Sequence, residues 1–176
     1  MAVCSKLHYL SKTYGMNTPD SSSRQQFETL IARIASEIAG RSLDPSLEDD
    51  LNRRFPSGGL VYRQLFEACR VGIIEGWLCN RESGGIRFGR VLKPGPATHG
   101  FSVDVVDMTP LVGPHHAHPN GEIDLIMPLE ERARFDGRGE GWMVYGPGSA
   151  HHPTVTGGRA LVLYLLPGGA IEFTRS

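Results

Sequence analysis

Three features are scarce in this chain of 176 residues, and each excludes a class of protein. No apolar run approaches the ~20 residues that a helix needs to cross a bilayer, so we expect no membrane partner. The cysteines, Cys4, Cys69 and Cys79, are odd in number and lack metal-site spacing, which argues against a disulfide framework. The formal net charge is -1, so no strong overall field favours nucleic acid.

The first residues, MAVCSKLHYLSKTYG, lack the apolar core of a secretory signal. Together with the cysteine content, this predicts a cytoplasmic protein in a reducing compartment. Cys69 and Cys79 are expected to be buried thiols, which is the common state of unpaired cysteines. The hydrophobic content of 40% is enough for one core, or for a core with a small appendage.

The first half of the sequence has the three- and four-residue periodicity of helices. Between Ser22 and Gly40, one apolar stripe consists of Phe27, Leu30, Ile31, Ile34 and Ile38. In LDPSLEDDLNRRF, Asp44 can cap a second helix that has Pro45 in its first turn. A third helix is predicted from about Leu60 to Cys69 or beyond. We therefore predict an α-helical N-terminal extension over residues 1–84.

After Cys79 the pattern changes to short β-prone runs separated by glycine, proline and asparagine. These runs are GIRFGRVL, GFSVDVVDM, GEIDLIMPL, GWMVYGPG and RALVLYLLPGGAIEF. Regularly spaced strands of this kind predict a sandwich or a barrel. No low-complexity linker separates the halves, so the helices are expected to pack on the β unit. The predicted fold class is α+β, with a β-barrel over residues 85–176.

The stretch GPHHAHPNGEIDL, residues 113–125, has three histidines within four positions and two acids shortly after. Because alternate side chains of a strand share a face, four of these groups point the same way if the extended register continues: His116, His118, Glu122 and Asp124. Burying two imidazoles and a carboxylate without a counter-charge is costly, whereas a divalent cation makes the same cluster favourable. The cluster therefore predicts a metal site inside the barrel.

A second cluster, GWMVYGPGSAHHP, places two histidines after a tight Pro-Gly turn. The two clusters together resemble the motifs of the cupin family, which are His-x-His with a following Glu, and G(x)5PxGxxH. The resemblance implies a cupin-type β-barrel, a double-stranded β-helix, that binds a divalent metal ion such as Fe, Mn, Zn or Ni. The implied metal ligands are His116, His118, Glu122 and His152.

The resemblance has departures that leave two points open. The cupin pattern is broken at Pro110, Leu129, Ser149 and Thr156. If the turn of the second motif is anchored on Gly148, His151 replaces His152 as the ligand. Barrels of this type also exist without an ion, and in a metal-free site the same histidines and Glu122 would do acid-base work directly.

Longer segments carry a more specific resemblance. HAHPNGEIDLIMPL and GPGSAHHPTVTGGRALVLYLLPGGAIEF, preceded by helices, resemble the 4-hydroxylaminobenzoate lyase family of nitroarene catabolism over most of the chain. The resemblance implies an enzyme that converts 4-hydroxylaminobenzoate and water to 3,4-dihydroxybenzoate and ammonia without net oxidation or reduction. A homodimer is expected at the family level only.

This chemistry needs an acid for the leaving oxygen and a positioned water. The candidates for proton transfer are Glu122, Asp124, Tyr145 and His151, although Asp124 is equally well placed to hold a ligating imidazole. An aromatic carboxylate also needs a cation, ideally a planar guanidinium. Arg87 and Arg90 are the candidates for substrate binding, and because they lie on opposite faces of one β-run, only one can point inward.

Two other functions fit parts of the sequence. A site of three histidines and one carboxylate also suits an iron-dependent dioxygenase acting on an aromatic substrate. The segment GIIEGWLCNRESGGIRFGRV after the helices could form a winged DNA-binding unit of a ligand-sensing regulator. Against the regulator, acids are interleaved with the basic residues and no Lys/Arg-rich recognition helix is present.

Overall fold

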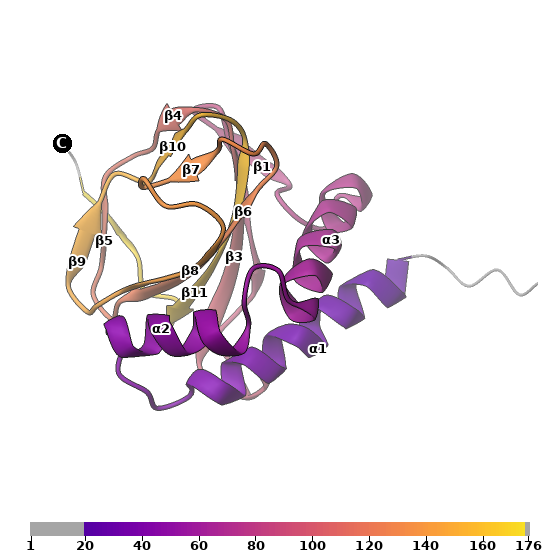
Figure 1. The fold of residues 1–176 in the computed structure, drawn as a ribbon, viewed down its shortest axis with the longest axis vertical. Helices are drawn as coiled ribbons and strands as arrows, with labels where there is room; N and C mark the ends of the chain where they lie inside the picture. The colour runs from indigo at the N-terminus through magenta and orange to yellow at the C-terminus, as the bar shows by residue number, and fades with distance from the viewer. Residues whose placement is uncertain (1–19, 175–176) are drawn as a thin grey trace, which may run out of the picture.

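The helical segment lies on one side of a β-barrel in the computed structural model, which describes residues 20–174 (Figure 1). The helices are α1 (Asp20–Ile38), α2 (Pro45–Arg54) and α3 (Leu60–Glu75). The start of α2 confirms the predicted cap, because Asp44 Oδ1 accepts a hydrogen bond from Leu47 N at 3.0 Å. The predicted helices are therefore confirmed.

The β part consists of one large antiparallel sheet and two small ones. The large sheet has the order β1 (Arg81–Ser83), β2 (Ile86–Leu92), β3 (Phe101–Met108), β11 (Ala160–Pro167), β6 (Glu122–Pro128), β8 (Gly141–Tyr145). The small sheets are β4 (Leu111–Val112), β10 (Thr154–Thr156), β7 (Arg134–Phe135), and β12 (Glu172–Phe173), β5 (His116–His118), β9 (Ser149–His151). A 3-10 helix, η1 (Pro96–Thr98), precedes β3. The large sheet and the small sheets curve round to face one another (Figure 1), which confirms the α+β class with a cupin-type barrel.

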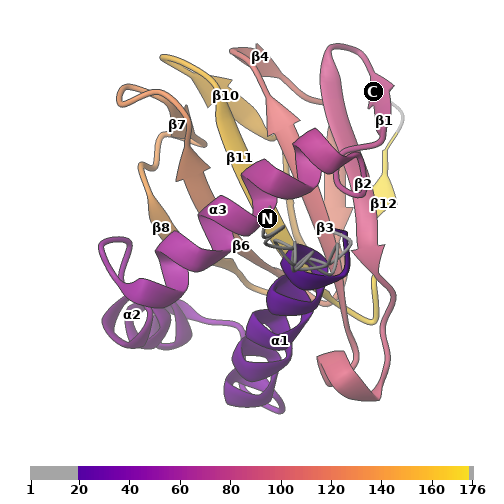
Figure 2. The ribbon, with the colours of Figure 1, turned by 90° about the vertical axis from the view of Figure 1, so that its right-hand side faces the viewer.

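The two faces of the large sheet have different partners. Its outer face packs on the helices (Figure 2) and contributes Val103, Val105, Ile123, Leu125, Leu161, Leu163 and Leu165 to a core shared with Phe27, Ile31 and Ile34 of α1. Its inner face contributes Met108, Ile126, Met143, Val162 and Tyr164 to a second core inside the barrel. The period of two along each strand therefore separates a helix-packing face from a barrel-lining face.

Helix α2 covers the edge strand β8 with side-chain hydrogen bonds. Asn52 Oδ1 accepts from Trp142 N, and Glu48 Oε2 accepts from Val144 N, both at 2.9 Å. The Trp142 indole in turn donates to Phe55 O at 3.0 Å. The bonds to the backbone amides of Trp142 and Val144 occupy edge positions of β8 that would otherwise be free to pair with another chain.

Two expectations from the composition can be compared with the structure. Cys69 and Cys79 are buried free thiols, as predicted, and burial raises the pKa of Cys79 to about 12. Among the described helices, none is long and apolar enough to span a membrane.

Candidate metal centre

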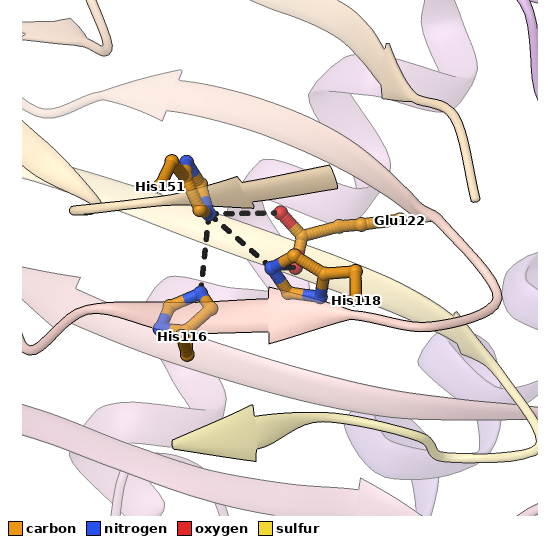
Figure 3. Close-up of side chains that lie close together, drawn as sticks. All are labelled: His116, His118, Glu122 and His151. Carbon is orange, nitrogen blue, oxygen red and sulfur yellow. Dashed lines mark hydrogen bonds and ion pairs between the residues drawn. The ribbon is translucent and has the colours of Figure 1, made fainter. Parts of the chain in front are cut away.

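Three strands bring four metal-binding side chains together inside the barrel. His116 and His118 lie on the same face of β5, and Glu122 opens β6 after a tight turn at Gly121, whose φ is 83°. The fourth group comes from β9, which pairs antiparallel with β5 so that His151 stands directly opposite His116. Figure 3 shows these side chains pointing toward one common centre.

The ligand atoms of this cluster lie within 4.8 Å of one another. His151 Nε2 is 3.1 Å from His116 Nε2 and 3.3 Å from His118 Nε2. Glu122 Oε2 is 3.1 Å from His118 Nε2, and Glu122 Oε1 is 3.6 Å from His151 Nε2. For comparison, nitrogens bound to one divalent ion at about 2.1 Å lie roughly 3.0–3.4 Å apart.

The hydrogen bonds on the far side of the rings show which nitrogens carry protons. His116 Nδ1 is 3.1 Å from Pro114 O, and His151 Nδ1 is 2.6 Å from Asp136 Oδ2. Because both partners are acceptors, each Nδ1 donates its proton outward, and this tautomer directs the lone pair of Nε2 toward the centre of the cluster. Lone pairs that face one another repel, and a cation between them removes this repulsion. The residues therefore fit a divalent metal ion.

Burial favours the uncharged form of His116, His118 and Glu122. It lowers the pKa of His116 to about 4 and that of His118 to about 3, with neighbouring histidines adding to the effect. Burial also raises the pKa of Glu122 to about 8. The His118–Glu122 contact is therefore between neutral groups in the metal-free protein near pH 7, and His116 and His118 are already in the state that binds a metal.

Asp124 follows Glu122 on the same face of β6 and is fully buried. Burial, with the Glu122 charge second, raises its pKa well above the usual value, so Asp124 retains a proton beside Glu122. Apart from the contacts of Glu122 with His118 and His151, the carboxyl oxygens of Asp124 and Glu122 have no hydrogen-bond partner among residues 20–174. Buried polar atoms of this kind are rare without an unseen partner, which is further support for an ion or water at this place.

Asp136 joins the site although the sequence analysis did not single it out. It lies between β7 and β8 with φ of 46°, and its carboxylate accepts bonds from His151 Nδ1 at 2.6 Å, Tyr145 OH at 2.7 Å and Thr154 N at 2.7 Å. Burial acts to raise the pKa of Asp136, but the bonds from His151 and Tyr145 outweigh it and the pKa is lowered. The local sequence around Asp136, FDG at residues 135–137, indicates only a turn and gives no sign of a role in the site.

Tyr145, one of the predicted proton-transfer residues, is held by this carboxylate. Burial and the bond to Asp136 raise its pKa, so the phenol stays protonated. The ring packs against His151 with centroids 4.7 Å apart. Its hydroxyl proton is already donated to Asp136, so its contacts make Tyr145 a group that supports His151.

The structure corrects the preference for His152 as the fourth ligand. His152 is exposed, its Nδ1 lies 3.1 Å from Gly113 O, and its ring packs on His115 with centroids 4.8 Å apart. The pairing of β9 with β5 places His151 opposite His116, and the next residue along the chain turns away. The structure therefore agrees with the alternative in which the second motif is anchored on Gly148 and His151 is the ligand.

The two predicted arginines lie on opposite faces, as expected, and only Arg90 is on the barrel side. Arg90 pairs in register with Asp104 on β3 and donates Nε to its carboxylate at 3.0 Å, while Nη2 donates to Gly169 O at 3.2 Å. Arg87 is instead 3.6 Å from Asp107, on the face that packs toward the helices. Arg90 lines the cavity described below and Arg87 does not, so the placement favours Arg90 of the two candidates.

A cavity of about 980 Å³ adjoins the metal-binding cluster through His116. Its charged lining groups are Arg81, Arg90, Lys93 and Asp104, so cations outnumber anions there. The rest of the wall is mainly apolar and includes Phe88, Val106, Tyr164, Leu166, Ile171 and Phe173. The volume lies at the upper end of the range for small-molecule sites, about 300–1,000 Å³.

Known proteins resemble this chain over most of its length. A family model described as PnbB, 4-hydroxylaminobenzoate lyase, matches residues 29–173. A 4-hydroxylaminobenzoate lyase of Nocardioides sp. (strain LMS-CY) is 33% identical over 147 residues, covering 78% of this chain and 87% of the relative. One of Pseudomonas putida is 28% identical over 85% of this chain and 95% of the relative. An RmlC-like cupin protein from Ralstonia eutropha JMP134 has a TM-score of 0.41 at 13% identity, over 53% of this chain and 62% of that structure.

Proposed function

Because the chain belongs to the 4-hydroxylaminobenzoate lyase family, we propose that this enzyme converts 4-hydroxylaminobenzoate and water to 3,4-dihydroxybenzoate and ammonia. The observation that carries the proposal is the convergence of three imidazole nitrogens and one carboxylate beside a largely apolar cavity with a cationic side. Such a cavity suits a single aromatic ring that bears a carboxylate.

The proposed reaction balances without an external oxidant or reductant. The N–O bond breaks, its oxygen leaves as water after taking a proton, and the ring supplies the two electrons that nitrogen gains. A water oxygen then bonds to the ring carbon beside the one that carries nitrogen and gives up a proton, which leaves that carbon tetrahedral and its neighbour doubly bonded to nitrogen. A second water hydrolyses this imine and releases ammonia, and the tetrahedral carbon then loses its hydrogen so that the ring becomes aromatic again. Because the first step releases one water, one water is consumed overall. Each step needs a group that gives or accepts a proton at a fixed position.

We assign His116, His118, His151 and Glu122 as the residues that would hold a divalent ion. When bound, the ion supplies a Lewis acid beside the cavity. The Nδ1 bonds of His116 and His151 hold their rings in orientation, and the strand pairing of β5 with β9 sets their separation. Glu122 and Asp124 are completely buried inside the barrel, which excludes bulk water from this side of the site.

Among the predicted proton-transfer residues, the contacts favour Asp124 as the proton store. Asp124 is fully buried beside Glu122, and burial together with the Glu122 charge raises its pKa well above the usual value, so Asp124 keeps a proton when Glu122 is ionised as a ligand. The His151 and Tyr145 protons are instead directed to Asp136. We therefore assign Asp124 to proton supply through Glu122, and Tyr145 to the orientation of His151.

We assign Arg90 to the substrate carboxylate. Arg90, Asp104, Tyr164 and Asp124 are register partners on β2, β3, β11 and β6, so Arg90 is three strand spacings, about 14 Å, from Asp124. This span suits an Arg side chain followed by a ring with its two polar groups at opposite ends. Arg81 and Lys93 offset the negative charge of Asp104, so the carboxylate would meet net positive charge.

The test is an anaerobic assay of the purified, full-length protein with 4-hydroxylaminobenzoate. We expect ammonia and 3,4-dihydroxybenzoate in equal amounts, and elemental analysis should find one divalent metal ion per chain. Oxygen consumption coupled to product formation would instead indicate a dioxygenase. Turnover that continues unchanged after complete removal of metal by a chelator would disprove the role of the ion but not the reaction.

A further inference from the structure

The C-terminal segment from Gly168 to Thr174, which contains β12, closes one side of the cavity. We propose that this segment positions the aromatic ring of the substrate, with Phe173 as the main contact. The inference rests on the proposed function and extends it to the recognition of the ring. The ligand class is a planar, single-ring aromatic carboxylate with its reacting nitrogen opposite the carboxylate.

Phe173 lies beside a candidate metal ligand. It is the register partner of His116 in the β12–β5 pair, and the two rings meet edge to face with centroids 5.5 Å apart. Directly opposed residues of an antiparallel pair point to the same side, so Phe173 shares the side of β5 that carries His116. Nevertheless 66% of Phe173 is exposed, and its side chain lines the cavity. A bound aromatic ring would cover apolar surface that is now open to water.

The end of the segment is attached to the strand that carries two of the metal-binding histidines. Thr174 N donates to His115 O at 3.2 Å, and the Thr174 hydroxyl contacts His115 Nδ1. Glu172 is in register with Ala117 of β5. The position of Phe173 is therefore set relative to His116 and His118, so that a ring resting on Phe173 is also placed relative to the metal-binding cluster.

The beginning of the segment contacts the group assigned to the substrate carboxylate. Gly169 O accepts the bond from Arg90 Nη2, and Gly169 has φ of 68°. A Cβ atom added there would come within 2.9 Å of Arg90 Nη1 and 3.2 Å of Pro94 Cγ. One short segment thus contacts both Arg90 and His116, which face the two ends of the proposed substrate, and places apolar Ile171 and Phe173 between them.

The size of the cavity makes such contacts necessary. About 980 Å³ is at the upper end of the range for ligand sites and exceeds what a single ring fills. Enclosure alone therefore does not fix the ring, and its position has to come from specific contacts such as those of Phe173. Near-attack geometry depends on this placement, so a misplaced ring would also lower the rate.

The experiment compares Phe173→Ala with the wild type and with two controls. For Phe173→Ala we expect KM for 4-hydroxylaminobenzoate, and Kd for the unreactive probe 4-hydroxybenzoate, to rise about tenfold. Bound metal should stay unchanged. Phe173→Tyr keeps the ring and should restore most of the affinity. Ile74→Ala removes a side chain that is 82% exposed on α3, away from the cavity, and should change neither constant.

The outcomes separate this inference from the proposed function. Wild-type turnover together with unchanged probe binding by Phe173→Ala would overturn the inference and leave the function standing. A wild-type protein that neither binds the probe nor releases ammonia would overturn both. If Phe173→Ala changes only the oligomeric state, measured by analytical ultracentrifugation, Phe173 is an interface residue between copies and the inference is wrong.

Discussion

The two faces of the large sheet use the same strands for different purposes. On β6, Ile123 and Leu125 point outward into the core shared with the helices, whereas Glu122 and Asp124 point inward to the metal-binding cluster. The outer face gains stability from apolar burial. The inner face holds buried carboxyl groups with few partners among the described residues, which is unfavourable for folding. The stability gained on the helix-packed face therefore has to offset the cost of burying the carboxyl groups on the barrel-lining face.

The largest expected effect separates two adjacent histidines. His151→Ala removes a ligand from the cluster and should lower kcat/KM at least about 1,000-fold, which corresponds to roughly 4 kcal/mol. His152→Ala, the matched control, removes an exposed ring outside the cluster and should keep kcat/KM within about threefold. Steady-state kinetics and metal content measure both. Equal losses in the two variants would contradict the assignment of His151.

The next effect concerns the outer face and acts on stability. Leu163→Ala leaves a cavity in the core between β11 and the helices and should lower the free energy of unfolding by about 3 kcal/mol. Leu60→Ala, at an exposed position of α3, should change it by less than about 0.5 kcal/mol. Urea denaturation of both variants tests this. We expect the folded fraction of Leu163→Ala to retain its kcat, and loss of kcat in fully folded protein would show that the two faces are not separable.

A smaller effect compares Asp136, beside the metal-binding cluster, with Asp107 on the outer face of the large sheet. Asp136→Asn weakens the acceptor for His151 Nδ1 while asparagine tolerates the φ of 46°, so metal affinity should fall about 10- to 100-fold. Asp107→Asn removes the charge that pairs with Arg159 on the outer face, and should lower stability but not metal affinity. Metal titration and urea denaturation give the two readouts. A similar loss of metal affinity in both variants would argue against a positioning role for Asp136.

The smallest effect is a pH dependence of the metal-free protein. The pKa of Glu122 is raised from 4.5 to about 8, so the folded state keeps a proton that the unfolded state releases. The free energy of unfolding should therefore fall as the pH rises from 4.5 to about 8. His116 and His118 act with the opposite sign, because their lowered pKa values, about 4 and about 3, make stability fall as the pH drops below about 6.5.

Between about pH 6.5 and 8, the pH dependence of the free energy of unfolding consequently reports the buried carboxyl groups and not the histidines. Urea denaturation across this interval, in the presence of a chelator, should show a smaller decline in Glu122→Gln than in the wild type. Glu131→Gln, at an exposed carboxylate, is the control and should follow the wild type. A wild-type slope in Glu122→Gln would mean that another group titrates in this interval.

Parts of the site followed from local sequence patterns. The spacing of His116 and His118 predicted a shared face of one strand, which the structure confirms. Glu122 joins them for a different reason than predicted, because the turn at Gly121 breaks the extended register and places Glu122 on β6 with its carboxylate beside the histidines. The Asp44–Pro45 pair predicted the start of α2, because a helix cap depends on neighbouring residues only. Such features need no knowledge of distant contacts.

Other parts could not follow from local patterns. The choice between His151 and His152 depends on the register of β9 against β5, which a shift of one residue would reverse. The choice between Arg87 and Arg90 depends in the same way on how β2 pairs with β3, including the irregularity between Arg90 and Leu92. Asp136 belongs to the site only because its loop folds back onto β10 and β9.

The amino-acid sequence by itself determined the helical and β-rich halves, the cap of α2 and the shared face of His116 and His118, because periodicity and capping act over a few residues. The tertiary structure alone decided which of two adjacent histidines joins that face, which arginine enters the cavity and which carboxylate orients the ligands. These choices depend on strand register and loop placement, which are set by contacts between residues far apart in the chain.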